Sequence, residues 1–188
     1  MRLSPDAHTS RPWRIHEIAR DFELEDVWAL PTPGGPDDFP RLVALAVALD
    51  PSRSASRPVR ALFALRWAIG DMLGWDEGDA TTATLRDRVP PDLRDAPRPA
   101  FEPLPAKTLY MTGDELAAEV ANRTVHGVIH LGWVEDECHG RYRGQMAILV
   151  KRNGRVGDAY MAAIRPFRYR VVYPRMLRDF EREWPRGA

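Results

Sequence analysis

The sequence predicts an α+β fold in which an antiparallel sheet packs against a long C-terminal helix. Two apolar stretches, 124–134 and 141–152, alternate with the period of two that is typical of strands. A short turn between them, at 135–140, lets them pair as antiparallel neighbours. The apolar residues of 165–184 instead recur at three- and four-residue steps, which indicates an amphipathic helix.

Length and composition narrow the class of protein. A chain of 188 residues suits one domain, expected at 13–186 behind a flexible polar tail at 1–12. Its 27 basic residues balance 27 acidic ones, so nothing indicates general attraction to nucleic acid or anionic lipid. The single cysteine, Cys138, excludes an internal disulfide and fits a reducing compartment. The most apolar run, 59–73, is too short and too charged to span a membrane. We therefore expect a cytoplasmic protein that does not insert into a membrane.

In the N-terminal half we expect a strand at 13–18, helices at 22–28, 39–49 and 59–73, and a proline-rich loop at 74–105. Acidic residues crowd the first turn of the predicted helix 22–28, where the helix dipole favours them. The helix 59–73 carries two apolar stripes, so it should pack between layers or lie over a cavity. Within the long loop, 84–89 could form a short strand or helix.

In the C-terminal half, a strand is expected at 107–111. Thr112 and Glu115 have the spacing of a capping box, which predicts a helix over 116–122. After the two long strands, Asn153-Gly154 is a strong hairpin signal, and it predicts a third strand at 156–162. These three strands would form an antiparallel meander, followed by the C-terminal helix.

The central strand carries the main candidate site. His126, Val128 and His130 share one of its faces, where polar groups lie among apolar ones. We predict that this face and the C-terminal helix enclose a cavity, lined by His126, Val128, His130, Arg143, Gln145, Phe167 and Val171. Polar groups scattered on an apolar wall are what orient a bound molecule. The simpler alternative is that both histidines are structural residues on a half-solvated face of the sheet.

No metal or cofactor is expected. On a strand, His126 and His130 stand roughly 13 Å apart, at about 3.3 Å per residue, so that one metal ion cannot bind both. The residues around Cys138 include metal-ligand types, but they fall in a predicted turn with no second cluster at ligand spacing. Glycine-rich nucleotide-binding patterns do not occur in the sequence.

A weaker candidate is an anion-binding group on the C-terminal helix. Arg165, Arg168 and Arg170 could bind an anionic head group near the mouth of the predicted cavity. The alternative is that they belong to a solvated helix face and pair with the domain's own carboxylates.

Two sequence stretches carry a family resemblance. They are Asn122-Arg123-Thr124-Val125-His126-Gly127 with Leu131-Gly132-Trp133, and Ile164-Arg165-Pro166-Phe167-Arg168 with Val172-Tyr173-Pro174. Over 13–184 the chain resembles a bacterial family of unknown function, some of whose members are fused behind short-chain-reductase-like domains. The order of elements also resembles the helix-grip superfamily of START, polyketide-cyclase and birch-pollen-allergen-like domains. That resemblance implies a curved sheet wrapped around the terminal helix and enclosing an apolar cavity. It implies no catalytic residue.

Three functions follow as expectations. The first is a binding domain that holds a small hydrophobic molecule between the sheet and the C-terminal helix. The second is an enzyme of the cyclase or hydratase kind, with His126 or His130 as general base. The third is a protein-interaction subunit whose core is filled by side chains. Fold alone decides among none of these functions. The volume of the cavity would separate the third function from the other two.

Overall fold

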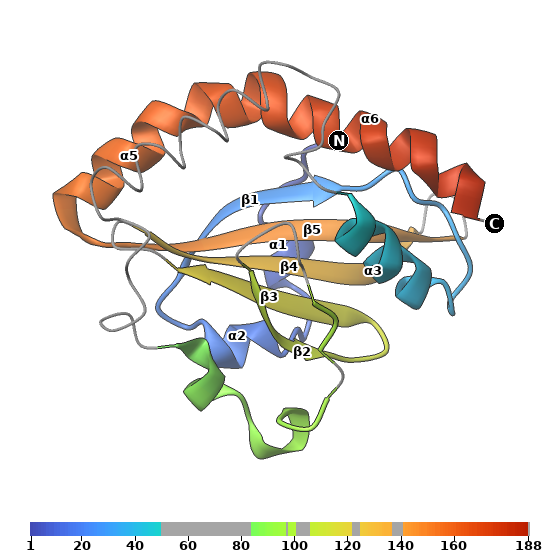
Figure 1. Cartoon of the computed structure of the whole chain (residues 1–188), viewed down its shortest axis with the longest axis horizontal. Helices are drawn as coiled ribbons and strands as arrows, with labels where there is room; N and C mark the ends of the chain where they lie inside the picture. The colour runs from blue at the N-terminus through green and yellow to red at the C-terminus, as the bar shows by residue number, and fades with distance from the viewer. Residues whose placement is uncertain (50–83, 97, 101–105, 122–124, 137–140, 188) are drawn as a thin grey trace.

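A five-stranded antiparallel sheet forms the centre of the structure, a computed structural model that describes residues 1–49, 84–96, 98–100, 106–121, 125–136 and 141–187. The strands lie in the order β1-β5-β4-β3-β2 (Figure 1). Their bounds are β1 (Glu23–Ala29), β2 (Lys107–Met111), β3 (Glu115–Ala121), β4 (Val125–Asp136) and β5 (Arg141–Arg152). The α+β class and the antiparallel sheet predicted from the sequence are confirmed.

The two longest strands, β4 and β5, pair along their whole length. Val125 lies opposite Arg152 at one end, and Asp136 lies opposite Arg141 at the other. The predicted pairing of 124–134 with 141–152 is therefore confirmed. The strand expected at 107–111 is also confirmed, as β2.

The helices flank the sheet on both faces. Their bounds are α1 (Asp6–Thr9), α2 (Ile15–Ile18), α3 (Phe39–Ala48), α5 (Gly154–Phe167) and α6 (Tyr173–Glu183). A π-helical segment, Arg168–Val172, joins α5 to α6, and we call these three elements the C-terminal helix, with 14, five and 11 residues. The predicted helix 39–49 is confirmed as α3, and 84–89 contains a short 3-10 helix, Leu85–Arg88. The predicted helix 59–73 lies outside the described residues.

Two N-terminal predictions are wrong, in opposite directions. Residues 13–18 contain the short helix α2 instead of a strand, and 22–28 contain the strand β1 instead of a helix. The acidic residues of β1 do not serve a helix dipole. Glu23 and Glu25 bind Arg152 of the neighbouring strand, at 2.6 and 2.8 Å. Pairing with β5 thus outweighs the local helical signal, as tertiary contacts commonly do.

The helix predicted over 116–122 is also wrong, because these residues belong to β3. The local hydrogen bond behind the prediction is nevertheless present, since Glu115 N donates to Thr112 Oγ1 at 3.1 Å. Thr112 N also donates to Glu115 O at 2.8 Å, which closes a turn between β2 and β3. A threonine that caps a helix and one that closes a turn use the same local geometry.

The third strand of the predicted meander, 156–162, is wrong as well. Gly154, at a φ of 65°, turns the chain, and α5 begins at this residue. Tyr160, Met161 and Ile164 then follow at helical spacing and pack against Val125 and Val150 of the sheet. The Asn-Gly signal correctly located a turn, but it did not determine which element follows.

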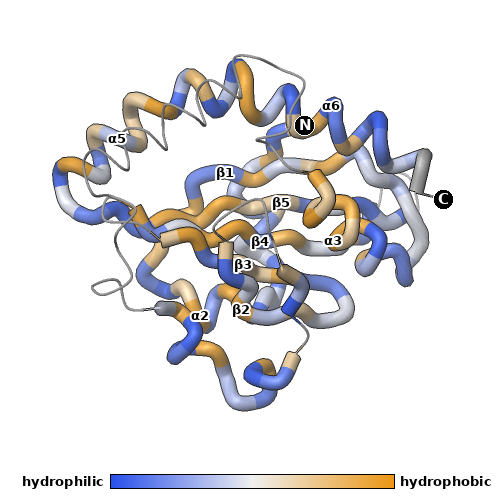
Figure 2. The backbone as a smooth tube through the Cα atoms, in the orientation of Figure 1, coloured by the Kyte–Doolittle hydropathy of each residue, from blue (hydrophilic) through white to orange (hydrophobic). Residues whose placement is uncertain are grey.

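Each face of the sheet has its own core. The α1–α2 side packs apolar residues such as Trp13, Ile15 and Ile18 against one face. On the other face, α3 and α6 contribute Phe39, Leu42, Tyr173 and Phe180, and Trp184 follows directly after α6. The C-terminal helix passes along this second face (Figure 1), and apolar and polar residues alternate along its turns (Figure 2).

Residues 1–12, expected to form a flexible tail, lie against the sheet in the structure. Leu3 N donates to Val27 O at 2.9 Å, and Ala29 N donates to Met1 O at 2.8 Å, so this segment pairs with the outer edge of β1. His8 on α1 is fully buried. These residues therefore help to position the candidate site.

Candidate functional site

The structure separates the two predicted walls of the cavity. Val128 is fully buried in the core on the α1–α2 side, and Gln145 Nε2 donates to Ala7 O there at 3.2 Å. The partly buried Phe167 and Val171 belong to the C-terminal helix, which passes along the opposite face. The histidines therefore lie on one face of the sheet. The C-terminal helix, which was expected to cover them, lies against the other face.

His130 belongs to a buried network centred on a carboxylate. His130 Nε2 lies 2.9 Å from Glu115 Oε2, which also accepts a hydrogen bond from the Tyr110 hydroxyl at 3.0 Å. Glu115 Oε1 accepts from Arg14 N at 2.9 Å. The register places Ala117 opposite His130 and Glu115 opposite Gly132, so Glu115 is a diagonal neighbour of His130 on the same face.

His8 extends this network on its other side. Its Nε2 lies 3.2 Å from His130 Nδ1. If His130 donates through Nε2 to Glu115, its Nδ1 accepts from His8 Nε2–H. His8 Nδ1 is then a buried acceptor without a hydrogen-bond partner among the described residues. The result is a chain of four groups, Tyr110–Glu115–His130–His8.

Burial sets the charges of this network. It lowers the pKa of His130, and it lowers that of His8 to about 3, with His130 and His16 adding to the effect on His8. Burial alone would raise the pKa of Glu115, but hydrogen bonds from His130, Arg14 and Tyr110 bring it below its usual value. At neutral pH the carboxylate is therefore charged and both histidines are neutral. Since both ring nitrogens of His130 have protein partners, this residue has no free lone pair for a substrate proton.

His126 pairs with a different carboxylate. Its Nε2 lies 3.1 Å from Glu119 Oε2, which also accepts from Leu85 N at 2.9 Å. Thr84 donates to the other oxygen of Glu119. Each histidine of β4 thus has its own glutamate on β3, and Glu119 links the sheet to the segment at 84–85. The predicted sharing of one cavity by the two histidines has no counterpart in these contacts.

A pocket of about 430 Å³ opens beside Glu115. It is lined by Arg11, Pro12, Trp13, Arg14, Thr112, Asp114, Glu115 and Trp133. Trp13 lies against Gly132, where an added Cβ would be 2.8 Å from the indole ring. Trp13 Nε1 is buried and has no hydrogen-bond partner in the described part of the chain. Trp133, the next residue of β4, also lines the pocket, but its ring packs in the core on the other face of the sheet, where its Nε1 donates to Gly35 O at 2.9 Å.

Arg143 lines a second pocket, of about 450 Å³, where β5 begins. The other lining residues are Leu30, Pro31, Thr32, Pro33, Asp136, Arg141 and Tyr142. Arg143 Nε forms an ion pair with Asp136 at 3.5 Å. Arg143 lies opposite Val134, which is on the histidine face of β4. It nevertheless lines this second pocket and not the pocket beside Glu115. The predicted turn around Cys138 lies in 137–140, outside the described residues.

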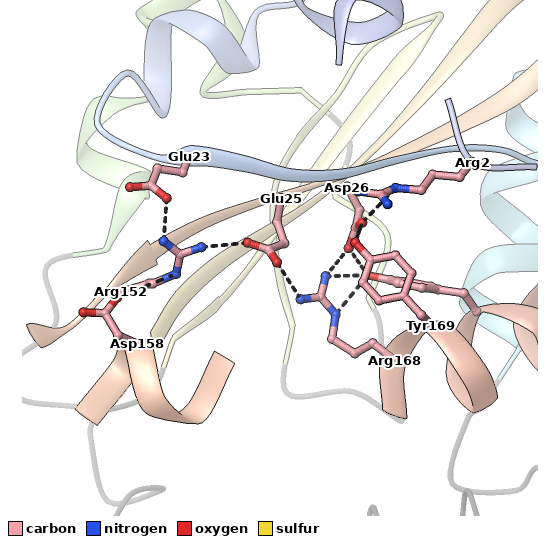
Figure 3. Close-up of polar contacts among 9 residues, drawn as sticks. Arg2, Glu23, Glu25, Asp26, Arg152, Asp158, Arg168 and Tyr169 are labelled. Atoms are coloured by element: carbon pink, nitrogen blue, oxygen red, sulfur yellow. Dashed lines mark hydrogen bonds and ion pairs between the residues drawn. The ribbon is translucent and has the colours of Figure 1, made fainter. Parts of the chain in front are cut away.

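On the other face, Arg168 binds the protein's own carboxylates (Figure 3). It pairs with the buried Asp26 and lies 3.6 Å from Glu25. Arg165 is exposed, with its guanidinium 6.0 Å from the centre of the Tyr169 ring, and Arg170 is exposed as well. The structure therefore does not unite these three arginines in one anion site, and Arg168 follows the alternative in which it pairs with the domain's own acids.

Sequence reasoning missed the residues that shape the pocket. His8 and Trp13 fell in segments expected to be a tail and a strand, and Glu115 was interpreted only as a helix cap. The nearest available signal was the tryptophan and histidine content of 8–16, which is unusual for a loose polar tail.

Neither a metal-binding cluster nor a membrane-spanning helix is found among the described residues. Within those residues, no group of three or more histidine, cysteine, aspartate or glutamate side chains is arranged to hold a metal ion. The described helices also include none that is long and apolar enough to cross a membrane.

Comparisons with known proteins identify the family of the chain. No curated protein and no solved structure matches the chain. The model of the DUF2867 family, described as a protein of unknown function, matches residues 18–175, which include all five strands and most of the C-terminal helix. The chain therefore belongs to the DUF2867 family.

Proposed function

We propose that the chain folds as one domain that binds a small, largely apolar molecule in the pocket beside Glu115. The observation that carries this proposal is a space of about 430 Å³ with Trp13 and Trp133 on its walls. Ligand sites commonly measure about 300–1,000 Å³ and combine apolar walls with a few polar groups. The Trp13 ring and Pro12 supply apolar surface, and Thr112 and Glu115 supply polar atoms. Ligand binding is also what the resemblance to helix-grip domains implies.

The walls of this pocket are held in place before any ligand arrives. Trp13 rests on Gly132, the ring nitrogen of Trp133 is hydrogen-bonded, and Glu115 accepts from three donors. A preformed site loses little side-chain entropy on binding, which favours affinity. The pocket that these contacts support lies at the end of the sheet. The sequence instead led us to expect the ligand under the C-terminal helix.

The polar groups beside the pocket favour binding over acid–base catalysis. A general base works best when its pKa is near the working pH. His130 instead has a lowered pKa and both nitrogens engaged, and Glu115 is held in its charged form by its donors. The network therefore supports the shape and the fixed charge of the pocket.

The test uses a neutral fluorescent probe, N-phenyl-1-naphthylamine, and native mass spectrometry of protein purified from its own host. We expect saturable probe binding, and Asp114→Trp should abolish it by filling the pocket from its exposed rim. Asp95→Trp is the matched control, because Asp95 is also exposed but does not line the pocket. Circular dichroism verifies that both variants fold.

A retained small molecule that is lost from Asp114→Trp would support the proposal directly. Absence of probe binding by the parent protein, or equal probe binding by the two tryptophan variants, would contradict it. In the first of these cases the interaction-subunit hypothesis would be favoured.

A further inference from the structure

We infer that the pocket beside Glu115 selects molecules that carry a carboxylate, with Arg11 as its partner. This inference rests on the proposed function, and it adds the chemical class of the ligand. Its basis is a difference within the pocket lining, where the Arg11 guanidinium has no partner among the described residues and the carboxylates accept hydrogen bonds from the protein.

The acceptors of the lining are occupied by protein donors. Glu115 accepts from Tyr110, His130 and Arg14 N. The exposed Asp114 accepts from the Thr112 hydroxyl at 2.9 Å. Both carboxylates therefore have their charge distributed over hydrogen bonds before a ligand binds, so that neither strongly requires a donor from the ligand.

Arg11 differs from the other donors of the lining. Trp13 Nε1 is buried, with no surface open to the pocket, and Arg14 Nε forms an ion pair with Glu17 at 3.6 Å. The side chain of Arg11 forms no hydrogen bond or ion pair with the described part of the chain. A ligand that supplies a charged acceptor can therefore bind the Arg11 guanidinium without displacing a protein partner.

The charges point to an anionic acceptor. Two arginines and two acidic residues line the pocket, but the Arg14 guanidinium already binds Asp92 at 3.0 Å, outside the lining. Among the described residues, Arg11 is thus the cation of the pocket without such a partner. Its planar guanidinium can bind a carboxylate through two parallel hydrogen bonds, which is the strongest geometry for this pair. The Trp13 ring can contact the apolar body of the ligand.

The test compares 1-naphthoate with 1-naphthamide, two probes of the same shape that differ in charge. At pH 7.5 the carboxylic acid is ionised. We expect the parent protein to bind naphthoate roughly tenfold or more tightly than the amide, because hydrogen bonds to charged groups are about twice as strong as neutral ones. Isothermal titration calorimetry measures both affinities.

Variants assign the effect to its residues. Arg11→Gln should weaken naphthoate binding roughly tenfold and leave naphthamide within about twofold, and Arg11→Lys should restore part of the loss. Arg20→Gln is the matched control, because Arg20 is exposed and does not line the pocket. Asp114→Asn should act in the opposite direction, strengthening naphthoate binding about two- to fivefold by removing a nearby negative charge.

Equal affinity of the parent for the two probes would overturn the inference, and so would equal losses of both probes in Arg11→Gln. The proposed function has its own readout in the neutral probe N-phenyl-1-naphthylamine. If this probe binds and Asp114→Trp blocks it while naphthoate shows no preference, the proposed function stands and the inference fails. If none of the three probes binds, both fail.

Discussion

Tyr173 donates a hydrogen bond of 2.8 Å to the buried carboxylate of Asp26, which lies 147 residues earlier in the chain. Arg168 and Tyr169 reach the same carboxylate (Figure 3). In an α-helix, residues five apart are rotated by about 140°, so Arg168 and Tyr173 would point in different directions. The π-helical segment at 168–172 places residues five apart on one side. A register shift in β1, between Leu24 and Asp26, accompanies it on the sheet. Two irregular segments thus meet at one acceptor.

We predict that Asp26→Asn will strongly destabilise the fold. The substitution removes the negative charge that compensates the largely buried Arg168, and it turns an NH₂ group toward donors. Breaking a buried ion pair on one side costs about 3–5 kcal/mol of unfolding free energy. Urea denaturation followed by circular dichroism measures the loss. Glu23→Gln is the control, because the Glu23 side chain is 71% exposed and its ion pair with Arg152 should contribute only about 0–1 kcal/mol. Similar losses in both variants would contradict the role of Asp26.

Val128→Trp should lower the melting temperature clearly. The side chain of Val128 is 0% exposed and packs in the core on the α1–α2 side, so a larger residue overpacks it at a cost of about 1–3 kcal/mol. Val156→Trp is the matched control, because Val156 is 59% exposed. Differential scanning calorimetry compares the two. An unchanged melting temperature for Val128→Trp would instead indicate space beside this residue, as the sequence-based cavity requires.

Secondary structure was predicted correctly for long elements whose pairing partners are close in the sequence. The strands β4 and β5 have 12 residues each and are neighbours in the chain, so alternation and a single turn were enough to define their pairing. The helix predicted at 39–49 is found as α3 at Phe39–Ala48. A short element has fewer residues to establish its period, so a local signal can mislead.

The errors at β1 and β3 show this limit. Acidic residues at 23–26 match the first turn of a helix, yet their partners are arginines of β5 and the C-terminal helix. Thr112 makes the hydrogen bond of a cap, yet a strand follows it. In both cases the local chemistry was recognised correctly, and the distant pairing that decides between helix and strand was not visible.

The candidate site depends still more on distant contacts. His8 reaches His130 across 122 positions, and Arg14 reaches Glu115 across 101. Periodicity identified His130 as a residue on the same face as Val128, but it could not show which segment covers that face. The N-terminal segment covers this face of the sheet. The pocket beside Glu115 therefore lies at the end of the sheet and not over its centre.

Gly132→Ala should disturb the pocket from below. An added Cβ would lie 2.8 Å from the Trp13 ring, so the ring must move or the strand must shift. We expect a loss of about 1–3 kcal/mol in unfolding free energy, weaker binding of N-phenyl-1-naphthylamine, and a change in tryptophan emission. Gly113→Ala is the control, because a Cβ there has no atom within 4 Å, and its stability should change by less than about 0.5 kcal/mol. Equal behaviour of the two variants would show that Trp13 does not depend on Gly132.

The stability of the fold should fall as the pH drops below 6.5, and His8 should contribute to the fall. Burial lowers the pKa of His8 from 6.5 to about 3 in the folded protein. Between these values the unfolded chain binds a proton that the folded protein does not, so the free energy of unfolding decreases with decreasing pH. Burial acts in the same direction on His130. The lowered pKa of Glu115 adds a contribution that is present above pH 4.5 and is lost below it.

His8→Gln isolates the contribution of His8. The glutamine amide can still donate to His130 Nδ1, but it does not titrate. Urea unfolding at pH 8, 7, 6, 5 and 4 should give a shallower slope for the variant below pH 6.5, by up to about 1.4 kcal/mol per pH unit, which corresponds to one proton. The other titrating groups are common to both proteins, so their effects cancel in the difference. Parallel stability curves for the two proteins over this range would show that His8 takes up its proton equally well in the folded and unfolded states.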